Sequence, residues 1–298
     1  MKKLIVFICM LVLGVNSFSL EIKDNKIYGE KGYNIQLKEY KRVIAIDPAV
    51  VETMYLLGAE DKIVGIAGTN RSKIWPYDKT PKLTSVGNTS KPNIEKIISL
   101  EPDLVIVNGM SLGIAETLRT KNIPVLVNDT TKDFGSILDS IKIYGEIFNK
   151  KVEGEKLYAE TQKKIDNLKE IKSLKKGTMR GMILYSTSPM MGFDAKSLPG
   201  QILDIIGIEN ITVGLKGSRP IISPEYLLAK NPNIIIGAMS INSADDIVNA
   251  NPFVKETDAA KNKSIFIVDS AKILRGSPRI FDAIEELYGE IEKCQNSK

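Results

Sequence analysis

Histidine is absent from all 298 residues of the chain. Histidine is the commonest general base and the commonest transition-metal ligand in proteins. Its absence therefore excludes Ser-His-Asp and Cys-His catalysis and any His-ligated zinc or manganese site. The chain also lacks the Gly-x-x-x-x-Gly-Lys-Ser/Thr loop that cradles nucleotide phosphates. We therefore expect neither an enzyme nor an intrinsic cofactor.

Cysteine occurs only as Cys9 and Cys294, and a long apolar run occurs only at residues 4–15. Two lysines precede that run, and Ser17-Phe18-Ser19 follows it. This pattern, with a run too short to span a bilayer easily, predicts a cleavable signal peptide over residues 1–19; a retained anchor helix is the alternative. Removal of this segment leaves one cysteine and therefore no intramolecular disulfide.

A lipid-anchor site is also missing. Cys9 lies inside the apolar run and follows Ile8, whereas a lipoprotein site needs a small residue before a cysteine at the end of the run. An exported chain without an anchor would diffuse away from a cell with one membrane. We therefore expect a chain that does not itself span a membrane and that lies in a periplasm between two membranes.

Strong charge of one sign is missing as well. The formal net charge is +5, of which Lys2 and Lys3 supply two, and basic residues form no long run. Acidic and basic residues are interspersed as on an ordinary solvated surface, so we expect no nucleic acid partner. Acidic clusters of the calcium-binding type are absent, so we expect no metal ion held by the protein itself.

An internal repeat is the strongest positive feature of the sequence. Residues 56–65 and 205–214 each read as a helix end, a glycine and a strand. Residues 93–107 and 223–236 each read as a capped short helix before an apolar strand, and residues 121–127 and 261–268 as a loop entering a buried strand. Strands alternating with helices predict parallel sheets with covered faces. We therefore expect two Rossmann-like α/β lobes, over residues 42–134 and 176–298.

One long helix is predicted between the repeats, over residues 135–175. It would join the lobes along one side, and two helices broken near Gly154 are the alternative. Residues 20–41 alternate polar and apolar residues around two turn signals, which predicts an N-terminal antiparallel hairpin. The apolar residues of the long helix recur at three- and four-residue steps: Ile137, Ile141, Tyr144, Phe148 and Val152.

Three motifs carry a resemblance to a known family. They are the opening strand and helix at residues 42–59, the entry to a central strand at residues 100–105, and the terminal loop at residues 273–279. The chain resembles the helical-backbone (class III) periplasmic substrate-binding proteins of ABC importers for iron–siderophore complexes, haem and cobalamin. The resemblance covers nearly all of the mature chain. It implies a ligand cleft between the lobes, at the carboxyl ends of the strands, and a monomeric protein that delivers its ligand to permease subunits.

The resemblance also implies a docking residue on each lobe. In this family an acidic residue of each lobe contacts arginines of the membrane subunits, and the matching residues here are Glu95 and Glu225. They hold equivalent positions in the repeat, each in the first turn of a predicted helix, which suits a transporter with two-fold symmetry. The alternative is that the helix dipole favours an acid at this position.

Loops that follow strands are expected to line the cleft. A planar ligand can stack on Trp75, or this side chain can plug its loop against the lobe. Arginines on three of these loops can neutralise a carboxylate or catecholate, or can be surface ion-pair partners, and the methionines can contact ligand or fill gaps in the core. The candidate ligand-binding residues are Asn70, Arg71, Trp75, Tyr77, Met110, Tyr185, Met190, Met191, Phe193, Arg219, Met239 and Arg275.

A preassembled chelate is the favoured ligand, because it needs no metal ligand from the protein. We therefore expect a complex of the ferric-siderophore type. Haem is an alternative through an axial ligand such as Tyr77 or Met190, and cobalamin through apolar and aromatic contacts. A small oxyanion held by backbone N–H groups and an arginine is a further alternative, and a two-lobed α/β enzyme is the least favoured.

Overall fold

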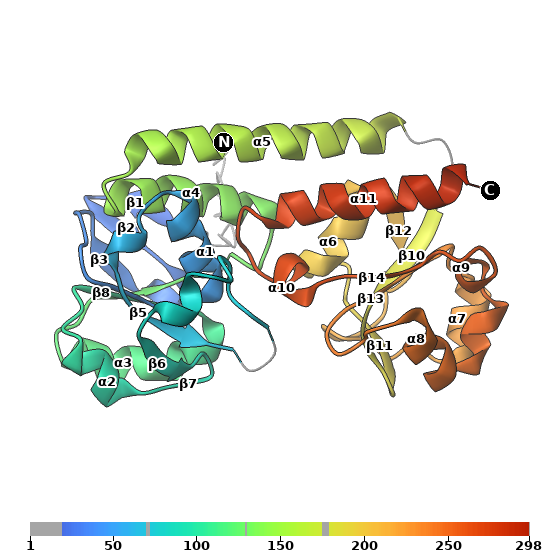
Figure 1. The fold of residues 1–298 in the computed structure, drawn as a ribbon, viewed down its shortest axis with the longest axis horizontal. Coiled ribbons are helices and arrows are strands. Elements are labelled where there is room, and N and C mark those ends of the chain that lie inside the picture. The colour runs from blue at the N-terminus through green and yellow to red at the C-terminus, as the bar shows by residue number, and fades with distance from the viewer. Residues whose placement is uncertain (1–19, 70–71, 129, 175–178, 298) are drawn as a thin grey trace, which may run out of the picture.

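Two α/β lobes lie side by side, and a long helix runs over both of them (Figure 1). The computed structural model describes residues 20–69, 72–128, 130–174 and 179–297. The predicted signal peptide lies outside these residues, as do Asn70 and Arg71. Within the described residues, no helix is long and apolar enough to cross a membrane.

The N-terminal lobe is built on a six-stranded sheet of order β7-β6-β5-β4-β8-β9, in which only β7 runs antiparallel to its neighbour. Its strands are β4 (Val43–Ala45), β5 (Ile63–Gly68), β6 (Ser85–Asn88), β7 (Lys91–Pro92), β8 (Leu104–Val107) and β9 (Val125–Val127). Its helices include α1 (Pro48–Leu56), α2 (Ile94–Ser99) and α3 (Ala115–Thr120).

The C-terminal lobe has a five-stranded sheet in which β11 is antiparallel to β10 and the other pairings are parallel. Its strands are β10 (Met179–Thr187), β11 (Met190–Gly192), β12 (Ile208–Asn210), β13 (Ile234–Gly237) and β14 (Ile265–Ile267). Its helices are α6 (Leu198–Ile205), α7 (Pro224–Lys230), α8 (Ala244–Ala250), α9 (Asp258–Lys261), α10 (Ser270–Ile273) and α11 (Ile280–Asn296).

The two sheets share one strand order, which confirms the predicted repeat. In the first lobe, β4 lies between β5 and β8, with β9 outside β8; in the second, β10 lies between β12 and β13, with β14 outside β13. Gly58 and Gly207 hold matched places in the repeat, and both have positive φ, at 64° and 72°. A residue other than glycine is strained in this left-handed conformation, so the glycines recur because the turn recurs.

The segment predicted as one linking helix is two helices, α4 (Phe134–Ile147) and α5 (Lys151–Leu174). The break falls at Asn149, whose φ of 54° ends α4 in the left-handed conformation that asparagine tolerates. α4 follows the last strand of the first lobe, β9, as α10 and α11 follow the last strand of the second, β14, so α4 is the N-terminal lobe's own helix. Of these two helices, α5 is the one that leads from the first lobe to the second, and its 24 residues span about 36 Å.

Close packing of α4 on α5 depends on Gly145 and Gly154. A Cβ built on Gly154 would lie 3.1 Å from the Cα of Gly145, so the two backbones meet where neither residue has a side chain. We expect Gly154→Val to lower the free energy of unfolding by about 1–3 kcal/mol, because the larger side chain forces the helices apart. Urea denaturation followed by circular dichroism measures this change.

Gly289 supplies the matched control for that substitution. It lies inside α11, and a Cβ added there meets nothing within 4 Å. Gly289→Val is therefore expected to change the free energy of unfolding by less than about 0.5 kcal/mol, since helix propensity differs little between the two residues. An equal loss in both variants would show that helix propensity, and not the contact between α4 and α5, sets the cost.

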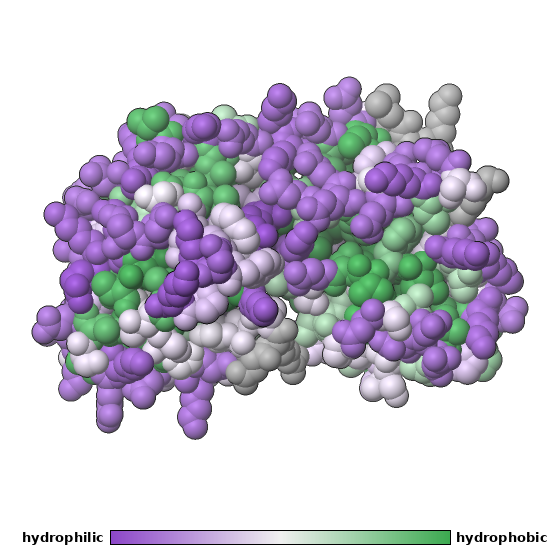
Figure 2. All heavy atoms as spheres, in the orientation of Figure 1, coloured by the Kyte–Doolittle hydropathy of each residue, from purple (hydrophilic) through white to green (hydrophobic). Residues whose placement is uncertain are grey.

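The N-terminal segment forms a three-stranded antiparallel sheet of β1 (Glu21–Lys23), β2 (Lys26–Tyr28) and β3 (Asn34–Gln36). The predicted hairpin is therefore present, and a third strand extends it. This sheet lies against β9, and a Cβ on Gly29 would come within 2.6 Å of the carbonyl oxygen of Val127. The edge of the first large sheet is thereby covered. β14, at the matching edge of the second sheet, stays half-exposed, and Figure 2 shows a hydrophobic area where it runs, between α11 and α8.

The lobes are joined by more than α5. One apolar cluster contains residues of both sheets and of α4, α5 and α11. The ring of Phe134, at the start of α4, lies 5.2 Å from that of Phe281, at the start of α11. The outer faces of the two sheets have separate cores. The two sheets are thus distinct, as predicted, but their helical layer is shared, which restricts motion of one lobe against the other.

Candidate functional site

A cleft of about 640 Å³ lies between the lobes. This volume is in the range of small-molecule sites. Ser72 lines it from the first lobe, in the segment after β5; from the second lobe, Tyr185 contributes from β10 and further residues from the loop after β13 and from α10. These are the carboxyl ends of parallel strands, where the expected cleft was placed. The lining residues are Ser72, Tyr185, Met239, Ser240, Asn242, Ser270, Ala271, Leu274 and Arg275.

A cation and an aromatic ring stand together at this cleft. The guanidinium carbon of Arg219 lies 3.9 Å from the centre of the Tyr185 ring, and Phe193 supports that ring edge-on at 5.7 Å. Arg219 is exposed and, within the described part of the chain, forms no ion pair with a carboxylate. Its charge is therefore free to pair with an anionic ligand, and the stacking on Tyr185 holds its orientation.

Met239 lines the cleft in a strained backbone conformation. Its φ is 63°, a left-handed value that an unbranched L-residue seldom adopts, and its amide donates a 2.6 Å hydrogen bond to the hydroxyl oxygen of Ser270. Strain of this kind is held in place by the surrounding structure and gathers at binding sites. The bond to Ser270 joins the loop after β13 to α10, so the two cleft-lining segments of the second lobe are fixed to each other.

Arg275 is a bridge between the lobes. Its Nη1 donates a 2.6 Å hydrogen bond to Oε1 of Glu52, in α1, and its Nη2 donates a 2.8 Å hydrogen bond to the hydroxyl of Ser72. Ser277 donates to the other oxygen of Glu52 at 2.7 Å, and Nη1 of Arg279 lies 3.4 Å from Oε1. Only 1% of the Glu52 side chain is exposed. Arg275 thus borders the cleft with its charge already paired.

Gly276 lets this bridge form. A Cβ at this position would lie 2.2 Å from the carbonyl oxygen of Thr130, so the backbone of the second lobe touches that of the first at a point that admits no side chain. The segment Arg275-Gly276-Ser277 therefore inserts into the first lobe. Together with α5, it is a second connection between the lobes.

The Trp75 side chain packs against Arg279 and Tyr55 and is not among the residues that line the cleft. Arg279 lies over its ring at 4.7 Å, and Tyr55 meets it edge-on at 6.3 Å. Tyr77, two residues later, is exposed. Of the two roles that the sequence left open for Trp75, packing of the loop against the lobe is the one that the geometry favours.

The remaining candidates are dispersed. Met190 is buried in the outer core of the second lobe, where it fills space, and Phe193 is buried beneath Tyr185. Met191 pairs with Ile221 in an isolated antiparallel bridge, and Met110 is 65% exposed on the segment after β8. The structure therefore brings Tyr185, Met239 and Arg275 to the cleft, with Arg219 and Phe193 packed against Tyr185.

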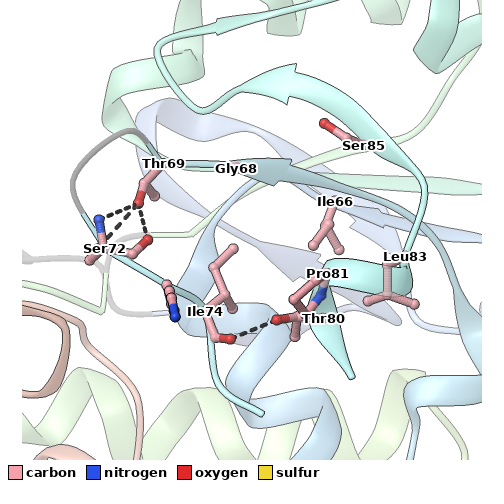
Figure 3. A pocket seen from close by; sticks show the side chains of 10 residues that line it. Ile66, Gly68, Thr69, Ser72, Ile74, Thr80, Pro81, Leu83 and Ser85 are labelled. Atoms are coloured by element: carbon pink, nitrogen blue, oxygen red, sulfur yellow. Dashed lines mark hydrogen bonds between the residues drawn. The ribbon is translucent and has the colours of Figure 1, made fainter. Parts of the chain in front are cut away.

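A second cavity, of about 480 Å³, lies in the first lobe on the other side of the segment after β5 (Figure 3). Its walls are mostly apolar, with Ile66, Ile74 and Leu83 at one end, while Thr69 and Ser72 bond to each other at the other. The Thr80 hydroxyl closes the floor by donating to the carbonyl oxygen of Ile74 at 2.6 Å. Ser72 lines both this cavity and the cleft. All of the residues that line this cavity belong to the first lobe, so a ligand bound there would not be enclosed between the two lobes.

Residues 109–113 (Gly-Met-Ser-Leu-Gly) carry the Gly-x-Ser-x-Gly spacing of hydrolase nucleophile turns, so the expectation that the sequence lacks this motif was wrong. Ser111 is 2% exposed. Its hydroxyl lies 3.3 Å from Oδ1 of Asn108 and accepts from the Asn108 amide at 3.1 Å, which completes a helix-capping box. A serine used in this way, in a chain without histidine, is a capping residue and not a nucleophile.

Glu95 and Glu225 occupy matched, exposed positions at the starts of α2 and α7. Asn93 caps α2 by accepting from the Lys96 amide at 2.9 Å, and Ser223 caps α7 by accepting from the Tyr226 amide at 3.2 Å. Hydrogen bonds from its own backbone amide and from Ser223 lower the pKa of Glu225. Both helices lie on the side of the molecule that faces away from α5 (Figure 1).

Among the described residues, no group of three or more Asp, Glu, Cys or His side chains is placed to hold a metal ion. Cys294 is a free thiol. The polar groups that line the cleft are instead hydroxyls, an amide and the Arg275 guanidinium, and the Arg219 guanidinium lies over the Tyr185 ring. Such groups donate hydrogen bonds to anionic oxygen atoms.

Comparison with known proteins gives consistent matches over most of the chain. The family described as periplasmic binding protein matches residues 43–271. The ABC transporter substrate-binding lipoprotein YvrC of Bacillus subtilis is 25% identical over 261 residues, which cover 85% of this chain and 81% of that protein. The petrobactin-binding protein YclQ of Bacillus subtilis is 26% identical over 245 residues, which cover 78% and 76%. Among solved structures, the periplasmic vitamin B12 binding protein BtuF of Vibrio cholerae superposes with a TM-score of 0.69 at 23% identity, over 86% of this chain and 98% of that one, which shows a common fold.

Proposed function

Because the chain belongs to the periplasmic binding protein family, which serves ABC importers as substrate-binding proteins and not as enzymes, we propose that its cargo is a ferric-siderophore-type chelate. The chelate lies in the cleft between the lobes and passes from there to the permease. The observation that carries this proposal is the exposed Arg219 guanidinium, stacked on Tyr185 at the cleft without a carboxylate partner among the described residues.

The chemistry of the cleft fits a preassembled anionic complex. Siderophores surround iron with catecholate, carboxylate or hydroxamate oxygens, so the protein needs only donors for those oxygens and a surface for the ligand's rings. Arg219 supplies charge-assisted hydrogen bonds, Tyr185 supplies a ring face, and Ser240, Asn242 and Ser270 supply further polar groups. The petrobactin-binding relative supports the same ligand class.

We also propose a docking role for two exposed acids and a periplasmic location for the chain. Glu95 and Glu225 contact the permease, one from each lobe, and the chain works in the periplasm after cleavage of residues 1–19. Sequencing of the exported protein from its N-terminus tests the last point, and a mature chain starting near Leu20 is expected. A retained Met1, or an acylated cysteine, would contradict it.

A panel of ligands tests the choice of cargo. The ferric complexes of petrobactin and citrate, haemin, cyanocobalamin and phosphate are titrated against the chain, and the fluorescence of Trp75, its only tryptophan, is recorded. We expect saturable one-to-one quenching by a ferric chelate, and none by phosphate. Tight binding of haemin or cyanocobalamin, without binding of any ferric chelate, would replace the proposed cargo with that ligand.

Removal of the free cation is expected to weaken binding. Arg219→Ala should lower the affinity for the ferric chelate about 10–100-fold, since a hydrogen bond to a charged group contributes roughly 1.5–3 kcal/mol. Isothermal titration calorimetry measures the dissociation constant. Lys216→Ala is the control, because Lys216 is an exposed cation of the same loop. Equal losses in both variants would reduce the role of Arg219 to general electrostatic attraction.

A further inference from the structure

Exposed apolar side chains gather around α7. Among the described residues, eight large apolar side chains are exposed, and four of them lie on α7 or on segments beside it. Single apolar residues scattered over a surface are ordinary, but a group of them marks an interaction site. The four residues, named here the α7 patch, are Val213 (62% exposed), Ile221 (66%), Leu228 (41%) and Phe253 (48%).

The patch is tied to α7 by specific contacts. The Tyr226 hydroxyl donates a 2.5 Å hydrogen bond to the carbonyl oxygen of Ile211, which holds the turn carrying Val213 beside the helix. The 3-10 segment Pro252–Glu256, which carries Phe253, packs on α7. Ile221 lies two residues before the Ser223 cap. The patch therefore has a fixed shape.

Glu225 lies on the same helix as one residue of this apolar group. Leu228 follows it by three residues on α7, so the two side chains share one face of the helix. Glu225 is itself exposed, and the hydrogen bonds that lower its pKa keep it ionised. An ion beside exposed apolar side chains is the usual make-up of a protein interface, in which an apolar centre is bordered by polar groups.

The matched surface of the other lobe differs. In the repeat, Lys91 holds the place of Ile221 and Ile98 holds that of Leu228. Lys91 is an exposed cation, and Ile98 is half-buried. The acid is thus common to both lobes, but the apolar group belongs to the C-terminal lobe. The two lobes share one fold, so the fold alone does not account for the apolar group of the C-terminal lobe.

We propose that the α7 patch is an apolar contact surface for a permease subunit of the importer, added to the ion pair of Glu225. This inference rests on the proposed docking role of Glu225. The occupant is a membrane subunit because the patch lies on the side away from α5, where α2 carries Glu95, and one partner spanning both lobes meets both helices there (Figure 1). The C-terminal lobe then contributes more of the docking affinity than the N-terminal lobe does.

The test replaces Ile221 of the C-terminal lobe with lysine, because Lys91 holds the matching position in the N-terminal lobe. Ile221→Lys is assayed for binding to the importer whose uptake the chain supports in cells, reconstituted in lipid nanodiscs. We expect binding at least about tenfold weaker, with unchanged affinity for the ferric chelate. Val152→Lys is the matched control, because Val152 is 77% exposed on α5, on the opposite side, and should leave docking unchanged.

The outcomes separate this inference from the proposed function. If Ile221→Lys docks normally while reversal of both Glu95 and Glu225 abolishes docking, the patch plays no part and the function stands. If neither change affects docking, both ideas fail. Sedimentation equilibrium of the unaltered chain is the second measurement. A dimer that Ile221→Lys dissolves would assign the patch to a second copy and overturn the inference.

Discussion

Replacement of Glu52 by glutamine is expected to lower the free energy of unfolding by about 3–5 kcal/mol. The carboxylate is 1% exposed and neutralises two guanidinium groups, those of Arg275 and Arg279. Glutamine keeps the size of the side chain but leaves both cations buried without a counter-charge. Because Arg275 and Ser277 hold Glu52 from the other lobe, the loss also frees the lobes to move. Urea denaturation, followed by circular dichroism, measures the change.

Two further variants show whether the charge is the cause. Glu39→Gln removes an ion pair with Lys62 in which the carboxylate is 36% exposed, so it should lower the free energy of unfolding by less than Glu52→Gln does. A triple variant, Glu52→Leu with Arg275→Met and Arg279→Met, removes all three charges and should regain much of the lost stability. If Glu52→Gln costs no more than Glu39→Gln, the buried cluster is not what joins the lobes.

Uptake is expected to cease when both docking acids are reversed. Glu95→Lys/Glu225→Lys should lower uptake of radioactive iron by at least about tenfold, because two attractive contacts with the permease become repulsive. Both side chains are exposed, so folding should be unaffected. Affinity for the ferric chelate should not change, because neither residue lines the cleft.

Net charge is controlled by a second double variant. Glu153→Lys/Glu155→Lys alters the total charge equally, at exposed positions in the first turns of α5, and should leave uptake unchanged. Glu153, like Glu95 and Glu225, lies in the first turn of its helix, so the cost of placing a cation there is also matched. Normal uptake by the Glu95/Glu225 variant would contradict the docking role. The acids would then be explained by the helix dipole, which favours an acidic residue in the first turn of a helix.

The sequence predicted the two lobes because the determinants of each repeat are local. A cap such as Asn93 or Ser223, and a glycine such as Gly58 or Gly207, specify a turn from a few neighbouring residues. Two copies in the same order then predicted two similar lobes, and the structure has one strand order in both sheets.

The linking helix shows where local pattern reading fails. Apolar spacing continues from Tyr144 through Phe148 to Val152, so periodicity alone indicated one helix. The left-handed Asn149 interrupts it, and Gly145 and Gly154 then allow α5 to fold back closely over α4. Asparagine was the available signal for the helix end, and the glycines marked a close contact and not a weak helix.

Site residues were found where they follow strands and missed where they depend on distant partners. Tyr185 and Met239 lie at or just after the ends of β10 and β13, and Arg275 lies in the loop after α10; all three line the cleft. The pairing of Arg275 with Glu52 joins positions 223 residues apart, so no local pattern reveals it. Glu52 is the one charged residue in α1, and this was the only sign in the sequence that it had a buried partner.

The most direct test of the central claim is a crystal structure of the chain with a ferric chelate, in which anomalous scattering locates the iron. We predict iron between the lobes, with anionic oxygens of the chelate within hydrogen-bond distance of Arg219 and its rings near Tyr185. Iron in the cavity bounded by Ile66, Ile74 and Leu83, or on the outer surface, would contradict this account.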